Sequence, residues 1–374
     1  MAESFRLKLD PNVPQKKLLA LDGGGIRGMI AVEVLAKIES LLQRRLGRDD
    51  KFVLADYFDY IAGTSTGAII ATCLSLGMRV DDIRKFYIDS GPAMFNRAGF
   101  LRKLHFKFED EPLAKKLREV IGANTTLGSE KLRTLLMMVL RNASTDSPWP
   151  LSNNPNAKYC AADLDDCNLN LPLWQLVRAS TAAPTYFPPE VVEVGSNRFI
   201  FVDGGMTMYN NPAFQLFMMA TVEPYNLNWQ TGRDRMLLVS IGTGTAPAAN
   251  EDLQPGQMNL LYNASSIPSA LMFAALNEQD FLCRAFGDTL EGDVIDGEVG
   301  DMIGKKGPTA EKLFTYVRYN AELTREGLNA LGLPKIEPTS VQKLDAIEAI
   351  PDLQEVGKAI GEMKVKEEHF ERFV

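Results

Sequence analysis

Ser65 has the strongest chemical context of the serines in this chain. It is the middle residue of GTSTG, between Gly63 and Gly67, and apolar runs flank it at residues 57–62 and 68–76. A G-x-S-x-G sequence between a strand and a helix is the pattern of a nucleophile elbow, a sharp turn that lifts a serine hydroxyl out of a sheet. The sequence therefore predicts a nucleophile for acyl transfer. The alternative is a small-residue turn that lets the helix pack closely on the sheet.

Histidine is scarce, which narrows the choice of a base for this serine. Only His105 and His369 occur, in the charged segments RKLHFKF and KVKEEHFERF. Neither follows a strand signal, where a triad histidine is expected, so a carboxylate is the favoured base. A Ser–His–Asp arrangement that uses His369 stays open as the alternative.

Asp203 is the carboxylate that best fits this role. It ends the apolar run at residues 199–202 and precedes Gly204 and Gly205, which leave room beside it. A strand would thus deliver the carboxylate to the sheet edge that carries Ser65. Burial in apolar surroundings raises the pKa of a carboxylate and makes it a stronger base. The alternative is an aspartate that only starts a turn at the end of the strand.

A third motif, DGGGIRG at residues 22–28, follows the first apolar run of the chain. Consecutive glycines expose backbone N–H groups, and a helix that begins near Gly28 adds the positive end of its dipole. Such a loop binds a phosphate or the oxyanion of a tetrahedral intermediate. Arg27 would hold a phosphate or stabilise the loop, or form an ordinary surface ion pair. The predicted backbone donors are Gly23, Gly24 and Gly25.

The same loop also fits the G-x-G-x-x-G pattern of dinucleotide-binding folds. The acidic pair Asp49-Asp50 follows about twenty residues later, but in the polar stretch GRDDK rather than at the end of an apolar strand. That reading leaves GTSTG unexplained, and no Gly-Lys-Ser/Thr follows as in a P-loop. A nucleotide-binding module that uses this loop remains the competing class of protein.

The elements around these motifs alternate between short apolar runs and amphipathic stretches of helix length. Strands are predicted at residues 18–21, 57–62, 159–162, 198–202 and 236–241. Helices are predicted at residues 29–46 and 68–76, and helical insertions around the site between residues 90 and 156. The pattern predicts an α/β fold, with a central, mostly parallel sheet and helices on both faces.

The chain is predicted to form one α/β domain over residues 15–325. Beyond Pro334 the sequence turns into short, charged helical segments without a strand signal. We therefore expect residues 326–374 to form a C-terminal helical extension.

Composition excludes several classes of protein. The net charge of −8 argues against general binding of DNA or RNA, which normally requires a basic surface. The four cysteines lack metal-site spacing, and no metal ion is expected at the acidic run of residues 163–166. Residues 1–15 contain no apolar run, so no signal peptide is expected, and no apolar run of the chain approaches the roughly 20 residues of a membrane span. These features predict a cytoplasmic protein.

In combination and in this order, DGGGIRG, GTSTG and DGG resemble the patatin-like phospholipase family. The blocks RASTAAPTYFP at residues 178–188 and SIGTG at residues 240–244 resemble it too, and the likeness covers residues 15–320. The resemblance implies a Ser–Asp dyad without histidine, with Ser65 as nucleophile and Asp203 as base, and an oxyanion hole drawn from the three glycines. It implies hydrolysis of phospholipid acyl esters through an acyl-enzyme, with no metal or organic cofactor.

A basic, aromatic segment, FNRAGFLRKLHFKF, spans residues 95–108. Basic residues interleaved with aromatic ones suit an anionic membrane surface or an anionic small ligand. The alternative is a lid helix with its aromatic side chains packed inward. The cations of this patch are Arg97, Arg102, Lys103 and Lys107.

The chain also resembles bacterial members of the family that act as effectors in cyclic-oligonucleotide antiphage signalling. In that group a cyclic dinucleotide switches on a phospholipase that degrades the membrane of its own cell. The resemblance implies membrane phospholipids and a cyclic dinucleotide as partners, and peripheral action at the inner membrane; homo-oligomerisation stays open. A housekeeping patatin without nucleotide control is the alternative.

Overall fold

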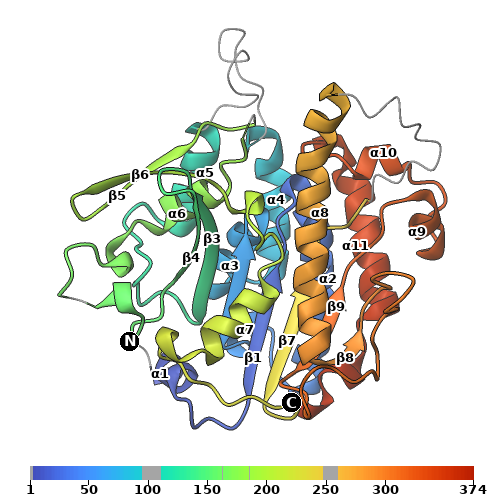
Figure 1. Cartoon of the computed structure of the whole chain (residues 1–374), viewed down its shortest axis with the longest axis horizontal. Coiled ribbons are helices and arrows are strands. Elements are labelled where there is room, and N and C mark those ends of the chain that lie inside the picture. Colours follow the sequence, from blue (N-terminus) through green and yellow to red (C-terminus); the bar gives the residue numbers. More distant parts are fainter. Residues whose placement is uncertain (1–2, 95–110, 162, 185, 247–259) are drawn as a thin grey trace.

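The structure, a computed structural model, describes residues 3–94, 111–161, 163–184, 186–246 and 260–374. Within this part of the chain, one sheet of nine strands runs through the molecule in the order β5-β6-β3-β2-β1-β7-β9-β8, and β4 pairs with β3 beside this path (Figure 1). The sheet is mostly parallel and helices cover both faces, so the predicted α/β fold is confirmed.

The parallel strands form the centre and one side of the sheet. They are β1 (Lys16–Leu21), β2 (Tyr60–Thr64), β3 (Leu135–Asn142), β7 (Met236–Ile241), β8 (Asp288–Glu291) and β9 (Thr315–Tyr319). The other side is antiparallel. Its strands are β4 (Ser147–Ser152), β5 (Glu190–Val194) and β6 (Asn197–Asp203).

The central strands are apolar at nearly every position because both of their faces are buried. Along β1, Leu18 and Ala20 join the core on one face, while Leu19 and Leu21 join the core on the other. The first face is covered by α1 (Glu3–Leu9), α7 (Ala213–Thr221) and α8 (Leu260–Phe286), of which α7 and α8 stand in front of the sheet in Figure 1.

The opposite face is covered by helices from both ends of the chain. They are α2 (Gly28–Arg45), α3 (Thr66–Ser75), α4 (Val80–Met94), α5 (Glu111–Ile121), α6 (Leu173–Ser180) and α11 (Ile350–Lys364). Two short helices, α9 (Arg325–Ala330) and α10 (Pro338–Val341), precede α11.

The helical character expected after Pro334 is confirmed by α10 and α11. Helix α11 packs along α2, and Leu353, Val356 and Ile360 are buried in the same core as α2 and α3. The C-terminal helix α11 therefore packs as one of the helices that cover this face of the sheet. The boundary between residues 325 and 326 remains a prediction.

Two predictions about local structure are wrong. The strand predicted at residues 159–162 does not form over the described residues 159–161, because Lys158–Cys160 is a 3-10 turn that follows backbone and side-chain bonds to Asn154. The region from 90 to 156 contains α5 but also β3 and β4. The run LLMMVLRN of β3 consists mainly of residues with good helix propensity, and an all-apolar run does not distinguish a buried strand from a buried helix.

The register of the sheet brings three chain segments to one edge. Leu21 pairs with Gly63, so the glycine loop after β1 and the turn after β2 leave the sheet side by side. Strand β6 reaches this place from the opposite direction. It runs antiparallel to β3 and ends with Asp203 opposite Leu140, at the level where β2 ends.

Candidate active site

Ser65 occupies the turn between β2 and α3 with φ 54° and ψ −121°, a backbone conformation that is unfavourable for a residue with a Cβ. The flanking glycines allow this turn through close backbone approach. A Cβ on Gly63 would lie 2.1 Å from the Gly67 carbonyl oxygen, and one on Gly67 would lie 2.3 Å from that of Leu21. The turn also places Ser65 at the N-terminal, positive end of α3.

The side chains of Ser65 and Asp203 are joined by a hydrogen bond. Ser65 Oγ donates to Asp203 Oδ2 at 2.6 Å, although 138 positions separate the two residues in the sequence. The second carboxylate oxygen, Oδ1, accepts from the Gly205 N–H at 2.7 Å. Asp203 is buried, so its carboxylate is oriented by two donors within an enclosed setting.

Further bonds hold the backbone around this pair. The Ser65 N–H donates to Ser180 Oγ at 3.0 Å, and the Ser180 hydroxyl donates to the Val139 carbonyl at 2.7 Å. The Asp203 N–H donates to the Ala182 carbonyl at 3.0 Å. Both anchors belong to the segment 178–188, so the RASTAAP block supports the serine and the aspartate from one side.

Burial raises the pKa of Asp203 to about 6. The hydrogen bonds from Ser65 and Gly205, and the positive charge of Arg178, oppose this rise. A carboxylate with this pKa is ionised at neutral pH and is a stronger base than an exposed aspartate.

The glycine loop lies beside Ser65 and is held from several directions. The Gly23 N–H donates to the Asn210 carbonyl at 3.1 Å, and the Ile26 N–H donates to the Leu344 carbonyl at 2.9 Å. The N–H groups of Gly24 and Gly25 have no hydrogen-bond partner among the described residues. Of the three predicted donors, Gly23 is thus already engaged, and the other two remain available to a ligand.

Arg27 extends from the end of this loop toward the same cavity, and Gly28 begins α2. The Nε atom of Arg27 is buried without a hydrogen-bond partner, and in the described part of the chain the Arg27 guanidinium forms no ion pair. Burial lowers the pKa of Arg27 to about 10, while the charge of Asp22 opposes this shift. An ordinary surface ion pair, one alternative for Arg27, is therefore not what the structure contains.

A cavity of about 220 Å³ opens over Ser65 and Asp203, and its wall includes Gly24 and Gly25. The remaining lining is largely apolar and comes from helices, loops and the C-terminal segment. Its apolar members include Ile69, Leu113, Pro184, Phe187, Met206, Met272 and Leu344. The cavity therefore suits a ligand with a hydrocarbon part and a polar group at its inner end.

The histidines do not take part in this arrangement as far as the structure describes them. His369 is buried, its Nδ1 lies 2.8 Å from Tyr319 Oη, and burial lowers its pKa to about 4. The second histidine, His105, lies outside the described residues, as do all four cations of the predicted basic patch: Arg97, Arg102, Lys103 and Lys107.

Several contributors to the site were not singled out from the sequence. Ser180 and Thr243 stood inside recognised blocks but carried no assigned role. Asn210 and Leu344 act through backbone carbonyls, which leave no signal in side-chain type.

In the described ranges there is no cluster of three or more metal-ligating side chains, and the structure describes no helix long and apolar enough to cross a bilayer.

Comparison with known proteins agrees with the motifs. The family model for patatin-like phospholipases matches residues 19–217, more than half of the chain, and the chain belongs to this family. Membership implies a lipid acyl hydrolase. The match includes the glycine loop, GTSTG and DGG together, a combination that a dinucleotide-binding module does not explain.

Relatives occur in plants and bacteria. The chain is 30% identical to Patatin-like protein 1 of Arabidopsis thaliana over 74% of this chain and 75% of that one. It is 29% identical to a cGAMP-activated phospholipase of Escherichia coli, over 62% of each chain. It is 30% identical to a cGAMP-activated phospholipase of Vibrio cholerae over 54% of this chain and 56% of that one. The matches thus span less than two thirds of both bacterial relatives.

Proposed function

We propose that the protein hydrolyses fatty acyl esters of membrane phospholipids, with Ser65 as the nucleophile and Asp203 as the general base. The observation that carries this proposal is the 2.6 Å hydrogen bond from Ser65 Oγ to Asp203 Oδ2 at the inner end of an apolar cavity. A carboxylate alone can activate a serine when burial has raised its pKa, as it has for Asp203.

The first half of the reaction forms an acyl-enzyme. Asp203 accepts the hydroxyl proton as Ser65 Oγ attacks the ester carbonyl carbon, and the carbonyl oxygen becomes an oxyanion. The N–H groups of Gly24 and Gly25 stabilise this charge. When the intermediate collapses, the bond to the alcohol breaks and the leaving lysophospholipid oxygen takes the proton from Asp203.

The second half reverses these steps with water. Asp203 accepts a proton from a water molecule while the oxygen of that water attacks the acyl carbon of the ester on Ser65. Collapse of the second intermediate breaks the bond to Oγ, which takes the proton back from Asp203 and releases the fatty acid. One water is consumed, and both side chains return to their starting protonation states.

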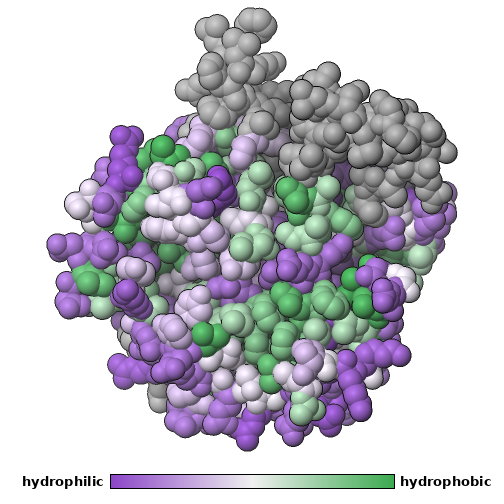
Figure 2. All heavy atoms as spheres, in the orientation of Figure 1, coloured by the Kyte–Doolittle hydropathy of each residue, from purple (hydrophilic) through white to green (hydrophobic). Residues whose placement is uncertain are grey.

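The surroundings of the pair support a lipid substrate. The cavity wall is mostly apolar, which suits an acyl chain, and the guanidinium of Arg27, which forms no ion pair with a described residue, suits the phosphate of a phospholipid. Met206 lines the cavity and is exposed, and Leu271 is exposed next to the lining residue Met272. Figure 2 shows apolar surface over α7 and α8 on this face of the molecule. Such a surface can meet a bilayer without a strong positive charge.

The test is release of fatty acid from phospholipid vesicles by four variants. Ser65→Ala and Asp203→Asn should each abolish hydrolysis while the protein still unfolds in one cooperative transition at a temperature no lower than that of the wild type. The controls are Ser40→Ala, an exposed serine of α2, and Asp50→Asn, an exposed aspartate, which should behave like the wild type. Full hydrolysis by Ser65→Ala would refute the proposed nucleophile.

We further propose that a cyclic dinucleotide activates this hydrolysis in antiphage defence, where the enzyme would degrade the inner membrane of its own cell. The support comes from two bacterial relatives that are named cGAMP-activated phospholipases. Labelling of Ser65 by a fluorophosphonate should accelerate when cGAMP or another cyclic dinucleotide is added. Labelling and hydrolysis that are indifferent to a panel of cyclic dinucleotides would favour a housekeeping patatin.

A further inference from the structure

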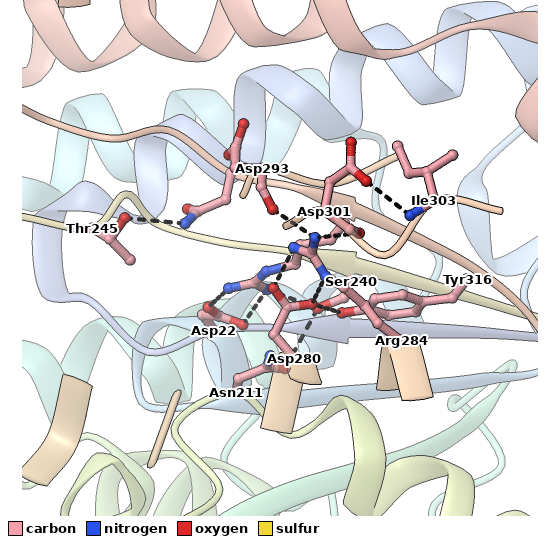
Figure 3. A network of polar contacts seen from close by, with 12 residues as sticks. Asp22, Asn211, Ser240, Thr245, Asp280, Arg284, Asp293, Asp301, Ile303 and Tyr316 are labelled. Atoms are coloured by element: carbon pink, nitrogen blue, oxygen red, sulfur yellow. Dashed lines mark hydrogen bonds and ion pairs between the residues drawn. The ribbon is translucent and has the colours of Figure 1, made fainter. Parts of the chain in front are cut away.

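The glycine loop is fixed at its root by a buried ion pair. Asp22 directly follows β1, and both of its carboxylate oxygens accept hydrogen bonds from the guanidinium of Arg318 on β9. Arg318 also donates to Ser240 Oγ at 2.7 Å. Figure 3 shows Asp22 and Ser240 in this network, next to Asp280, Arg284 and Tyr316. The network fixes where the loop begins, but among the described residues none of its hydrogen bonds reaches the N–H groups of Gly24 and Gly25.

Thr243 contacts one of these peptide units directly. Its side chain is buried, and its hydroxyl donates to the Gly23 carbonyl oxygen at 2.7 Å. The approach is close, because a Cβ on Gly24 would lie 2.1 Å from Thr243 Oγ1. The glycine at position 24 and the threonine at position 243 therefore fit each other at a single point of the loop.

The hydrogen bond to Gly23 has a consequence for Gly24. The carbonyl of Gly23 and the N–H of Gly24 belong to the same peptide unit, and the described residues contain no cis peptide bond. In a trans peptide unit the C=O and the N–H are rigidly coupled and point in opposite directions. A donor that holds the Gly23 carbonyl therefore also sets the direction of the Gly24 N–H, which has no partner among the described residues.

Thr243 is itself held in place by the end of β9. The Gly242 N–H donates to the Tyr319 carbonyl at 2.8 Å, and the Gly244 N–H donates to Asn320 Oδ1 at 3.0 Å. The turn that carries Thr243 is thus anchored on both sides of the threonine. The hydroxyl is presented to the glycine loop from a fixed position after β7.

We propose that Thr243 is a positioning residue for the hydrolysis: its hydroxyl holds the Gly23 carbonyl so that the Gly24 N–H is oriented to receive the developing oxyanion. The inference rests on the proposed function, since it assigns a role within the same site. Thr243 does not contact the substrate in this proposal; it acts through the peptide unit between Gly23 and Gly24.

The test compares Thr243→Val, which removes the hydroxyl and keeps the shape, with Thr243→Ser, which keeps the hydroxyl. Loss of one oxyanion donor typically costs about 10²- to 10³-fold in kcat, and misorientation of one should cost a part of this, about tenfold. We expect Thr243→Val to lower kcat for a short-chain phosphatidylcholine about tenfold with KM unchanged. Thr243→Ser should stay close to the wild type.

Thr245→Val is the matched control. Thr245 lies two residues further along the same turn. Its hydroxyl donates to the Ala321 carbonyl at 3.3 Å and accepts a long bond from Asn320 Nδ2 at 3.4 Å, so it bonds to the chain after β9 rather than to the glycine loop. Rates are divided by the concentration of sites that a fluorophosphonate titrates to completion, so that a loss of folded protein does not count as a loss of kcat. Should Thr243→Val fail to fold, Thr243→Ala takes its place in the comparison with Thr243→Ser.

The proposal is overturned if the variant without the hydroxyl keeps the wild-type kcat. It is also overturned if Thr243→Ser or Thr245→Val loses as much as Thr243→Val, because packing of the turn would then be the cause. Ser65→Ala is measured in the same assay. If it hydrolyses lipid like the wild type, the proposed nucleophile fails, and that failure is distinct from a failure of Thr243 to position the loop.

Discussion

The two sides of the sheet contribute to the site in different ways. On the parallel side, β1 and β2 each end in a glycine-containing turn, and the two turns lie next to each other because Leu21 pairs with Gly63. On the antiparallel side, β6 arrives from the opposite direction and ends at Asp203 beside Leu140. The carboxyl ends of parallel strands meet at one edge by rule, whereas the place where an antiparallel strand ends depends on its register.

The proposed site is more rigid on the parallel side of the sheet than on the antiparallel side. Ser65 and the glycine loop stand on central strands with neighbours on both sides. Asp203 stands at the end of a strand whose pairing with β3 covers only three residues, Leu140 to Asn142. We therefore expect substitutions on the parallel side to lower mainly the free energy of unfolding. Substitutions on the antiparallel side should lower mainly the rate of hydrolysis.

The largest effects are expected from Gly63→Ala on the parallel side and Gly204→Ala on the antiparallel side. In each case the new Cβ would lie 2.1 Å from a backbone carbonyl oxygen, that of Gly67 or that of Val139. Gly63 is within β2, so Gly63→Ala should cost about 3 kcal/mol or more of the free energy of unfolding. Gly204→Ala should cost about 1 to 3 kcal/mol, because β6 can shift, but that shift displaces Asp203 and removes hydrolysis.

Chemical denaturation and vesicle hydrolysis measure both quantities for this pair of variants. Equal losses of stability with equal residual activity would contradict the distinction between the two sides. A control is Gly47→Ala, at a helix end where a Cβ meets no atom within 4 Å but φ is +59°, so that only the backbone preference of glycine is lost.

A smaller effect is expected from the pH dependence of Asp203. Because its pKa is raised to about 6, hydrolysis should rise with pH as Asp203 ionises and level off above that pH. Burial in the folded protein favours the protonated carboxyl of Asp203. The stability that this group contributes is therefore complete below the pKa of about 4 in the unfolded chain, and it is lost as pH rises through the folded-state pKa of about 6.

Asp203→Asn isolates the contribution of the carboxylate charge to stability, because asparagine is neutral at every pH. The variant should be inactive, and at pH 8 it should be more stable than the wild type by on the order of 2 kcal/mol, with the difference vanishing near pH 4. Thermal or chemical unfolding at several pH values measures it. An activity profile without an inflection near pH 6 would argue against Asp203 as the base.

The smallest effect on activity is expected at His369. Burial lowers its pKa to about 4, so the stability that the neutral ring contributes is complete above the unfolded pKa of about 6.5 and is lost as pH falls toward 4. His369→Gln should remove this acid sensitivity, cost about 1 kcal/mol at pH 8 and leave hydrolysis unchanged. A hundredfold loss of hydrolysis would instead revive the Ser–His–Asp alternative.

Much of the fold was predictable because it depends on local patterns. The strands of β1, β6 and β7 and the helices α2 and α3 appear where the apolar runs predict them. Strand β3 was missed because a run of buried leucine and methionine has no period that separates strand from helix. The turn at Lys158–Cys160 was missed because the polar bonds of Asn154 outweigh a short apolar run.

The family, the parallel core of the sheet and the candidate residues Ser65 and Asp203 could be predicted from the sequence, because each follows from residue types over a few adjacent positions. Three further features became visible once the chain was folded: the direction from which Asp203 reaches the site, the hydrogen bond of the Gly23 N–H to Asn210, and the contacts of Thr243 and Leu344 with the glycine loop. These contacts join residues that are distant in sequence, and most of them use backbone groups common to all residues. Strand register and side-chain packing therefore determine which residues make these contacts, and no short sequence motif predicts them.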